Sequence, residues 1–63
     1  MTHRTASLEE FLTVREVAKI CHVSTRSVRR WIDLGELVAY RFGRQLRIAH
    51  ADLDVFVKLR RKL

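Results

Sequence analysis

Arginine side chains gather in two separate stretches of this sequence. Residues 23–35 (VSTRSVRRWIDLG) carry Arg26, Arg29 and Arg30, and residues 37–48 (LVAYRFGRQLRI) carry Arg41, Arg44 and Arg47. A guanidinium group donates paired hydrogen bonds to phosphate oxygens and to O6 and N7 of guanine. These stretches therefore indicate binding to nucleic acid.

The overall charge points to the same class of partner. Lysine and arginine outnumber aspartate and glutamate 13 to 7 in 63 residues, so the formal net charge is +6. Such an excess favours a polyanion, either nucleic acid or an anionic membrane surface. Because 48% of the residues are apolar, the chain is expected to fold as one small domain and not to remain a disordered basic tail.

The residues that could support other chemistry are few. Cys21 is the only cysteine, and with His3, His22 and His50 it provides no four-ligand metal spacing. The sequence shows no acid–base pair for a cleft and no glycine-rich phosphate loop, so we expect neither an enzyme nor a cofactor, metal or small-molecule ligand. No apolar run is long enough for a signal peptide or a membrane span, and a reducing cytoplasm is the expected compartment.

The first arginine cluster is predicted to lie on a helix of about ten residues. Ser24 is a favoured N-cap, and Gly35 is the residue type preferred just after a helix end, where φ is positive. At 100° per residue, one face carries Val28, Trp31 and Ile32. The opposite face carries Arg26, Arg29, Arg30 and Asp33. An ordinary solvated surface helix is the alternative interpretation.

A second short helix is predicted immediately before it. Thr13 and Glu16 form a capping box, with Leu12 placed as a hydrophobic staple. The apolar stripe contains Val14, Val17, Ala18 and Cys21, whereas Arg15 and Lys19 face outward. Only three to four residues separate the two helices, which predicts a helix-turn-helix. An antiparallel αα-hairpin is the alternative, although it usually requires longer helices.

The stretch after Gly35 changes from a helical to an alternating pattern. Residues 37–48 predict a two-stranded β-hairpin with its turn at residues 43–45, which must pack on the helices because such a hairpin is marginally stable alone. Residues 50–63 predict a final helix, whose apolar positions are Leu53, Phe56, Val57 and Leu59. Residues 1–11 are expected to form a flexible arm, mobile over residues 1–6, with a capping box at Ser7 and Glu10.

These motifs, taken together, resemble the excisionase family of winged helix-turn-helix proteins, relatives of the MerR-type DNA-binding domain. The resemblance covers residues 12–56 and rests on LTVREVA, VSTRSV, the Trp31-Ile32 pair, GEL, the Gly43-Arg44 pair and the Asp52-Leu53 pair. It implies a mainly α fold with a small β-hairpin, in which residues 12–63 form a single winged helix-turn-helix domain. His22 stands where glycine is common, Cys21 where a larger aliphatic is usual, and Val38 where proline is common.

The resemblance also implies which residues contact double-stranded DNA. The second helix would enter the major groove, and the hairpin wing would lie along the backbone or the minor groove. The expected major-groove residues are Ser24, Thr25, Arg26, Ser27, Arg29 and Arg30. The expected wing residues are Tyr40, Arg41, Arg44, Gln45 and Arg47.

As an excisionase, the protein would bind repeated sites cooperatively, associating head to tail, and bend the DNA for an integrase or another recombinase. Its expected location is the bacterial cytoplasm, associated with the nucleoid. A small transcriptional regulator of a phage or mobile element is the alternative. A basic amphipathic module that docks on a membrane or a protein is a third interpretation, against which the change of period after Gly35 argues.

Overall fold

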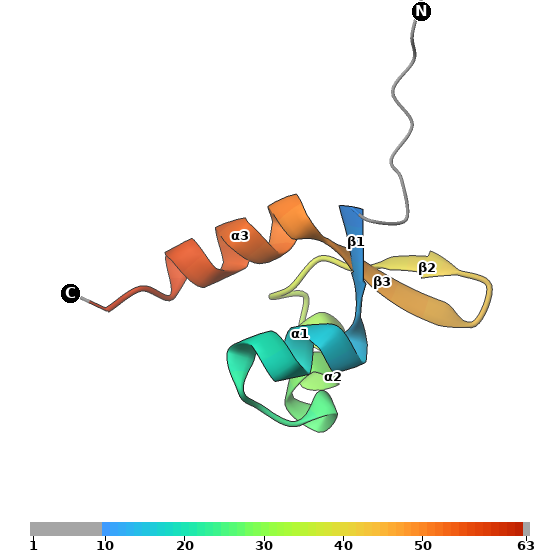
Figure 1. Cartoon of the computed structure of the whole chain (residues 1–63), viewed down its shortest axis with the longest axis horizontal. Helices are drawn as coiled ribbons and strands as arrows, with labels where there is room; N and C mark the ends of the chain where they lie inside the picture. The colour runs from blue at the N-terminus through green and yellow to red at the C-terminus, as the bar shows by residue number, and fades with distance from the viewer. Residues whose placement is uncertain (1–9, 63) are drawn as a thin grey trace, which may run out of the picture.

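The computed structural model describes residues 10–62, which form three helices and three strands (Figure 1). In chain order these are β1 (Phe11–Thr13), α1 (Val14–Cys21), α2 (Thr25–Asp33), β2 (Tyr40–Phe42), β3 (Gln45–Ala49) and α3 (His50–Leu59). In Figure 1, α1 and α2 lie below the sheet, while α3 and the β2–β3 hairpin extend to opposite sides of β1. The predictions for residues 1–6 and for Ser7 lie outside the described residues.

The sheet has three antiparallel strands in the order β1-β3-β2, so the prediction of a two-stranded hairpin was incomplete. Leu12 lies opposite Ile48 in the β1–β3 ladder, and Arg41 lies opposite Leu46 in the β2–β3 ladder. Strand β1 pairs with the edge of β3 that β2 leaves free, and it places Leu12 in the core. Phe11, which the sequence assigned to the flexible arm, is the first residue of β1.

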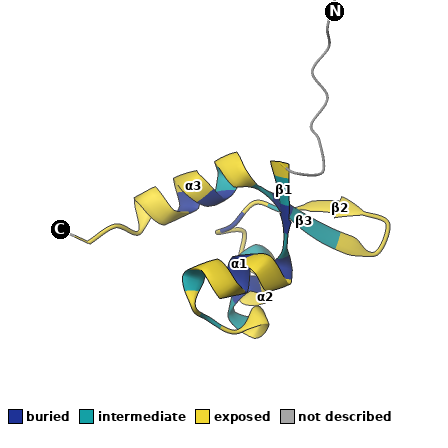
Figure 2. Cartoon of the chain, in the orientation of Figure 1, coloured by how far each residue is buried: buried dark blue, intermediate teal, exposed yellow. Residues whose placement is uncertain are grey.

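The core lies where α1 and α2 meet the sheet, as the buried positions in Figure 2 show. Its most buried side chains are Val17 of α1, Val28 of α2, Leu37 of the loop that follows α2, and Ile48 of β3. The predicted stripe of α1 is confirmed for Val14, Val17 and Ala18, whereas Cys21 is half-buried and packs at the edge of the core.

The turn between α1 and α2 confirms the helix-turn-helix prediction, since only residues 22–24 separate the two helices. At the start of α1, the Glu16 amide donates to Thr13 Oγ1 at 3.0 Å, and the Thr13 amide donates to Glu16 Oε1 at 2.9 Å. At its end His22 adopts φ 58°, and the Val23 amide donates to the Ala18 carbonyl at 2.9 Å. This left-handed residue reverses the chain and directs it into α2.

The bounds of α2 follow from its two caps. Ser24 Oγ accepts a hydrogen bond from the Ser27 amide at 3.1 Å. Gly35 has φ 77°, which lets its amide donate to the Ile32 carbonyl and the Glu36 amide donate to the Trp31 carbonyl. These bonds end the helix at the predicted glycine.

The last helix is shorter and less buried than its pattern predicts. It ends at Leu59, and Leu53 and Phe56 are its buried residues, whereas Val57 and Leu59 are 48% and 79% exposed. Helix α3 projects from one side of the molecule (Figures 1 and 2), and within it only Leu53 and Phe56 are buried in the core, where Phe56 packs on Trp31 with ring centroids 4.8 Å apart. Within residues 10–62, none of the helices combines the length and apolarity that a bilayer crossing requires.

Candidate nucleic-acid interface

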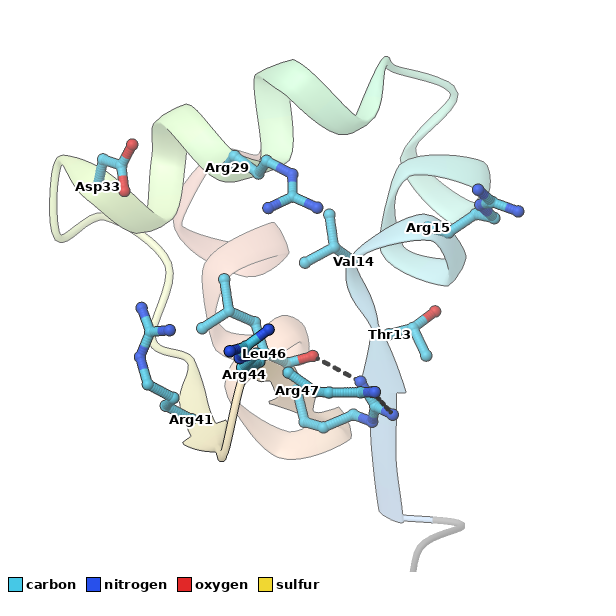
Figure 3. Close-up of a pocket in the computed structure, with 10 residues that line it drawn as sticks. Thr13, Val14, Arg15, Arg29, Asp33, Arg41, Arg44, Leu46 and Arg47 are labelled. Atoms are coloured by element: carbon cyan, nitrogen blue, oxygen red, sulfur yellow. Dashed lines mark hydrogen bonds between the residues drawn. The ribbon is translucent and has the colours of Figure 1, made fainter.

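An open hollow of about 660 Å³ lies between α2 and the β2–β3 hairpin. Five arginines line it, from three different elements (Figure 3). They are Arg15 of α1, Arg29 of α2, and Arg41, Arg44 and Arg47 of the hairpin. Thus the fold brings one arginine of the first stretch, Arg29, together with all three arginines of the second, and we name this surface the arginine hollow.

Helix α2 contributes Arg29 and Asp33, which lie one helical turn apart, to the arginine hollow. Val28 is fully buried on the opposite face and fixes the rotation of the helix. Arg26 and Arg30 are exposed, as their spacing predicts, but they lie outside the residues that line the hollow. On the outward face of α2, Arg29 and Asp33 therefore line the hollow, whereas Arg26 and Arg30 lie outside it.

The N-terminal end of α2 contains the three smaller residues that the resemblance assigns to the major groove. The hydroxyls of Ser24 and Ser27 lie 3.2 Å apart and share a hydrogen bond, and the Ser24 hydroxyl also caps the helix. Ser27 is half-buried, while Thr25 is exposed at the first helical position. The two serine hydroxyls are thus engaged with each other and with the helix end.

The hairpin holds its arginines in two different ways. Arg47 donates from Nη1 to the Leu46 carbonyl at 2.9 Å and from Nη2 to Gln45 Oε1 at 2.6 Å. Arg41 and Arg44 have no hydrogen bond or ion pair to the described part of the chain. Arg47 is therefore oriented before any ligand arrives, whereas all the donors of Arg41 and Arg44 are available to one.

Tyr40 is the predicted wing residue that the fold does not bring to the arginine hollow. Successive side chains of a strand point to opposite faces, so Tyr40 and Arg41 leave β2 on different sides. Arg47 pairs with Tyr40 in the β2–β3 ladder and shares its side of the sheet, although it lines the hollow. The Tyr40 ring packs edge-on against Phe11 with centroids 5.6 Å apart, and it stacks beside Phe42 at 6.5 Å. These three rings cover the outer face of the sheet.

Arg15 is the arginine of the hollow that sequence reasoning did not assign to a DNA contact. Its outward orientation was predicted, but nothing local in the sequence placed it beside the hairpin. The pairing of β1 with β3 brings the first turn of α1 to the hairpin. A strand prediction for residues 11–13 would have supplied that signal.

The electrostatics of the hollow follow from its composition. Five arginines and one carboxylate, that of Asp33, line this open surface. Like charges that share one surface repel one another, and an anionic ligand with regularly spaced charges would relieve the repulsion. Among the described residues, no three His, Cys, Asp or Glu side chains gather where they could hold a metal ion.

Residues 11–61 match the family described as Helix-turn-helix domain. The chain belongs to this family. Helix-turn-helix proteins that bind DNA place their second helix in the major groove, and the match supports DNA binding.

The sequence is also similar to that of a described bacterial protein. The helix-turn-helix chain is 42% identical over 55 residues to the transcriptional repressor DcmR of Methylorubrum extorquens (strain DSM 6343 / CIP 106787 / DM4). The match covers 84% of this chain and 21% of that protein, so the chain spans about a fifth of the length of this relative. No solved structure matches the chain.

Proposed function

We propose that this domain binds double-stranded DNA in a sequence-specific manner and performs no catalysis. Helix α2 would enter the major groove, and the β2–β3 hairpin would follow the adjacent backbone or the minor groove. The arginine hollow is the observation that carries this proposal, because it places cationic side chains of both elements on one concave surface. A groove-inserted helix and a flanking wing need this common orientation.

The two arginine sets would perform different tasks. On α2, Arg26 and Arg29 would make base-specific contacts, since arginine bonded to guanine O6 and N7 is the commonest such contact. Arg30 and Thr25 would contact the groove edge, and the exposed amide end of the helix at Ser24 would hold a phosphate. In the wing, phosphate or minor-groove contacts would come from Arg41, Arg44, Gln45 and Arg47.

Separate alanine variants of α2 and the wing test this division. We expect Arg26→Ala to weaken binding to the cognate site by about 1–3 kcal/mol and to relax base preference at one position. Arg44→Ala should weaken cognate and random duplexes alike, because a phosphate contact carries no sequence information. Electrophoretic mobility shifts on both duplexes measure the two effects. Equal losses on both duplexes for Arg26→Ala would remove it from the base-contacting residues.

For the cellular role, we propose a recombination directionality factor, on the strength of the sequence resemblance to excisionases. A single module of this size buries only about 600–1,000 Å² on DNA, so one copy alone would bind with limited selectivity. Several copies, bound head to tail on direct repeats, would gain affinity and bend the DNA for a partner recombinase. Gel mobility of circularly permuted fragments measures the bend, and a single unbent footprint would contradict this role.

The similarity to DcmR, described as a transcriptional repressor, favours a second candidate role, control of transcription. The same DNA-binding surface would then act at a promoter without a recombinase. Footprints on the DNA flanking the gene, combined with a promoter reporter and an excision assay, separate the two roles. Reduced reporter expression with unchanged excision would support the regulator, and the reverse result would support the excisionase.

A further inference from the structure

Asp33 is the acidic side chain among the residues that line the arginine hollow. It is exposed at the last position of α2, and within residues 10–62 it has no hydrogen bond or ion pair. Arg29 lies one turn before it on the same helix and also lines the hollow, yet no ion pair joins the two. The carboxylate is therefore free to meet a ligand.

Two electrostatic interactions disfavour a carboxylate at this place. A negative charge in the last turn of a helix interacts unfavourably with the helix dipole, so Asp33 does not stabilise α2. Its charge would also repel the phosphates that the surrounding arginines attract. The arginines of the hollow attract this carboxylate, yet none of them forms an ion pair with it, so among residues 10–62 it has no direct partner.

We propose that Asp33 is a specificity-determining residue that accepts a hydrogen bond from the N4 amino group of cytosine in the major groove. This inference rests on the proposed insertion of α2 into that groove. Four residues of helix rise about 6 Å, a little less than two base steps of 3.4 Å. The cytosine would therefore lie within about two base pairs of the guanine that Arg29 contacts.

The hydrogen-bonding pattern of the groove selects cytosine over the other bases. An ionised carboxylate only accepts hydrogen bonds, and the major-groove edges of guanine and thymine present only acceptors to it. Adenine offers its N6 amino group beside the N7 acceptor, which would repel the second carboxylate oxygen. Cytosine offers N4 without a neighbouring acceptor on its own edge.

Enrichment of duplexes from a randomised library by the wild-type chain and by the Asp33→Asn variant tests the inference. Asparagine pairs with N6 and N7 of adenine, so the variant should change the preferred base at one position from cytosine to adenine. The discrimination lost at that position should be about 5- to 150-fold, which corresponds to one good base contact. Preferences at the remaining positions should stay unchanged.

Asp54→Asn is the matched control, because it makes the same change of charge outside the hollow. Asp54 lies on α3, where its carboxylate pairs with Lys58 Nζ at 3.0 Å. This variant should enrich the same sequences as the wild type. Circular dichroism of all three proteins verifies that each is folded.

Several results would overturn the inference while leaving DNA binding intact. The first is that Asp33→Asn and the wild type prefer identical sequences. The second is a uniform gain in affinity that Asp54→Asn reproduces. The third is a changed base preference that is confined to the position of the guanine contacted by Arg29. The last result would make Asp33 a positioning residue for Arg29. If the folded wild-type chain binds no duplex, the proposed function and the inference are both wrong.

Discussion

Arg15 offers a test of the hollow that depends on the fold and not on the sequence motifs. On a random duplex Arg29 meets no cognate guanine, so if each of the five arginines of the hollow neutralises one phosphate there, log K should fall against log salt with a slope of about −4.5. Affinity for a random duplex should then fall about 500-fold between 50 and 200 mM salt. Arg15→Gln removes one contact, which should reduce the slope to about −3.6 and the loss to about 150-fold.

The assay is fluorescence anisotropy of a labelled random-sequence duplex, titrated at four or five salt concentrations in that interval. Lys19→Gln is the control, because Lys19 is exposed one turn further along α1 and does not line the hollow. Its slope should equal that of the wild type. Equal slopes for Arg15→Gln and Lys19→Gln would show that Arg15 makes no phosphate contact and would refute its place in the phosphate-binding surface.

Three further predictions concern the stability of the domain and are checked by thermal unfolding. Gly35→Ala should cost about 1–2 kcal/mol, because a left-handed φ strains any side chain although no atom lies within 4 Å of the added Cβ. His22→Gly should gain about 0.5–1 kcal/mol by relieving the same strain at φ 58°, and an unchanged melting temperature would contradict it. Arg60→Ala should lower Tm by about 4–8 °C. The Arg60 guanidinium carbon lies 3.8 Å from the centroid of the Phe56 ring, and its Nη2 lies 2.6 Å from Glu36 Oε1, and these two contacts together stabilise the fold by about 1 kcal/mol. Arg61→Ala is its control, and an equal effect there would show that these contacts do not stabilise the fold.

The parts of the fold that short-range patterns determine were predictable from the sequence. The N-cap of α2 at Ser24, the left-handed Gly35 after its end, the capping box of α1 at Thr13 and the buried position of Val28 all follow from residues within a few positions of one another. Local hydrogen bonds and helical periodicity decide such features. Because the helix caps and the helical periodicity indicate the same bounds and the same buried face for α2, the arginines of α2 were correctly placed on its exposed face.

Strand β1 was not predictable on the same basis, because its pairing is not local. Three residues carry too little alternation to indicate a strand, and the partner of Leu12 is Ile48, far along the chain. Thr13 also ends the strand while it caps α1, so the local signal favoured the helix alone. Missing β1 meant missing Arg15, whose place in the hollow depends on that pairing.

The exposure of Val57 and Leu59 has a related cause. Their spacing fits a helix that packs along its whole length, but a domain this small has no further surface for α3 to cover, and only Leu53 and Phe56 reach the core. Periodicity reports which residues share a helix face, and the size of the neighbouring core decides how much of that face is covered.

The hollow and the core are linked, because the elements that carry the arginines meet through a few buried side chains. Val28 anchors α2 and Ile48 anchors β3, and both belong to the same cluster as Leu37. The separation between Arg29 and the hairpin arginines is therefore fixed by core packing and not by direct contacts among the arginines, which repel one another. A small core that holds mutually repelling charges in place gains stability when a polyanion neutralises them, so DNA binding and folding should strengthen each other in this domain.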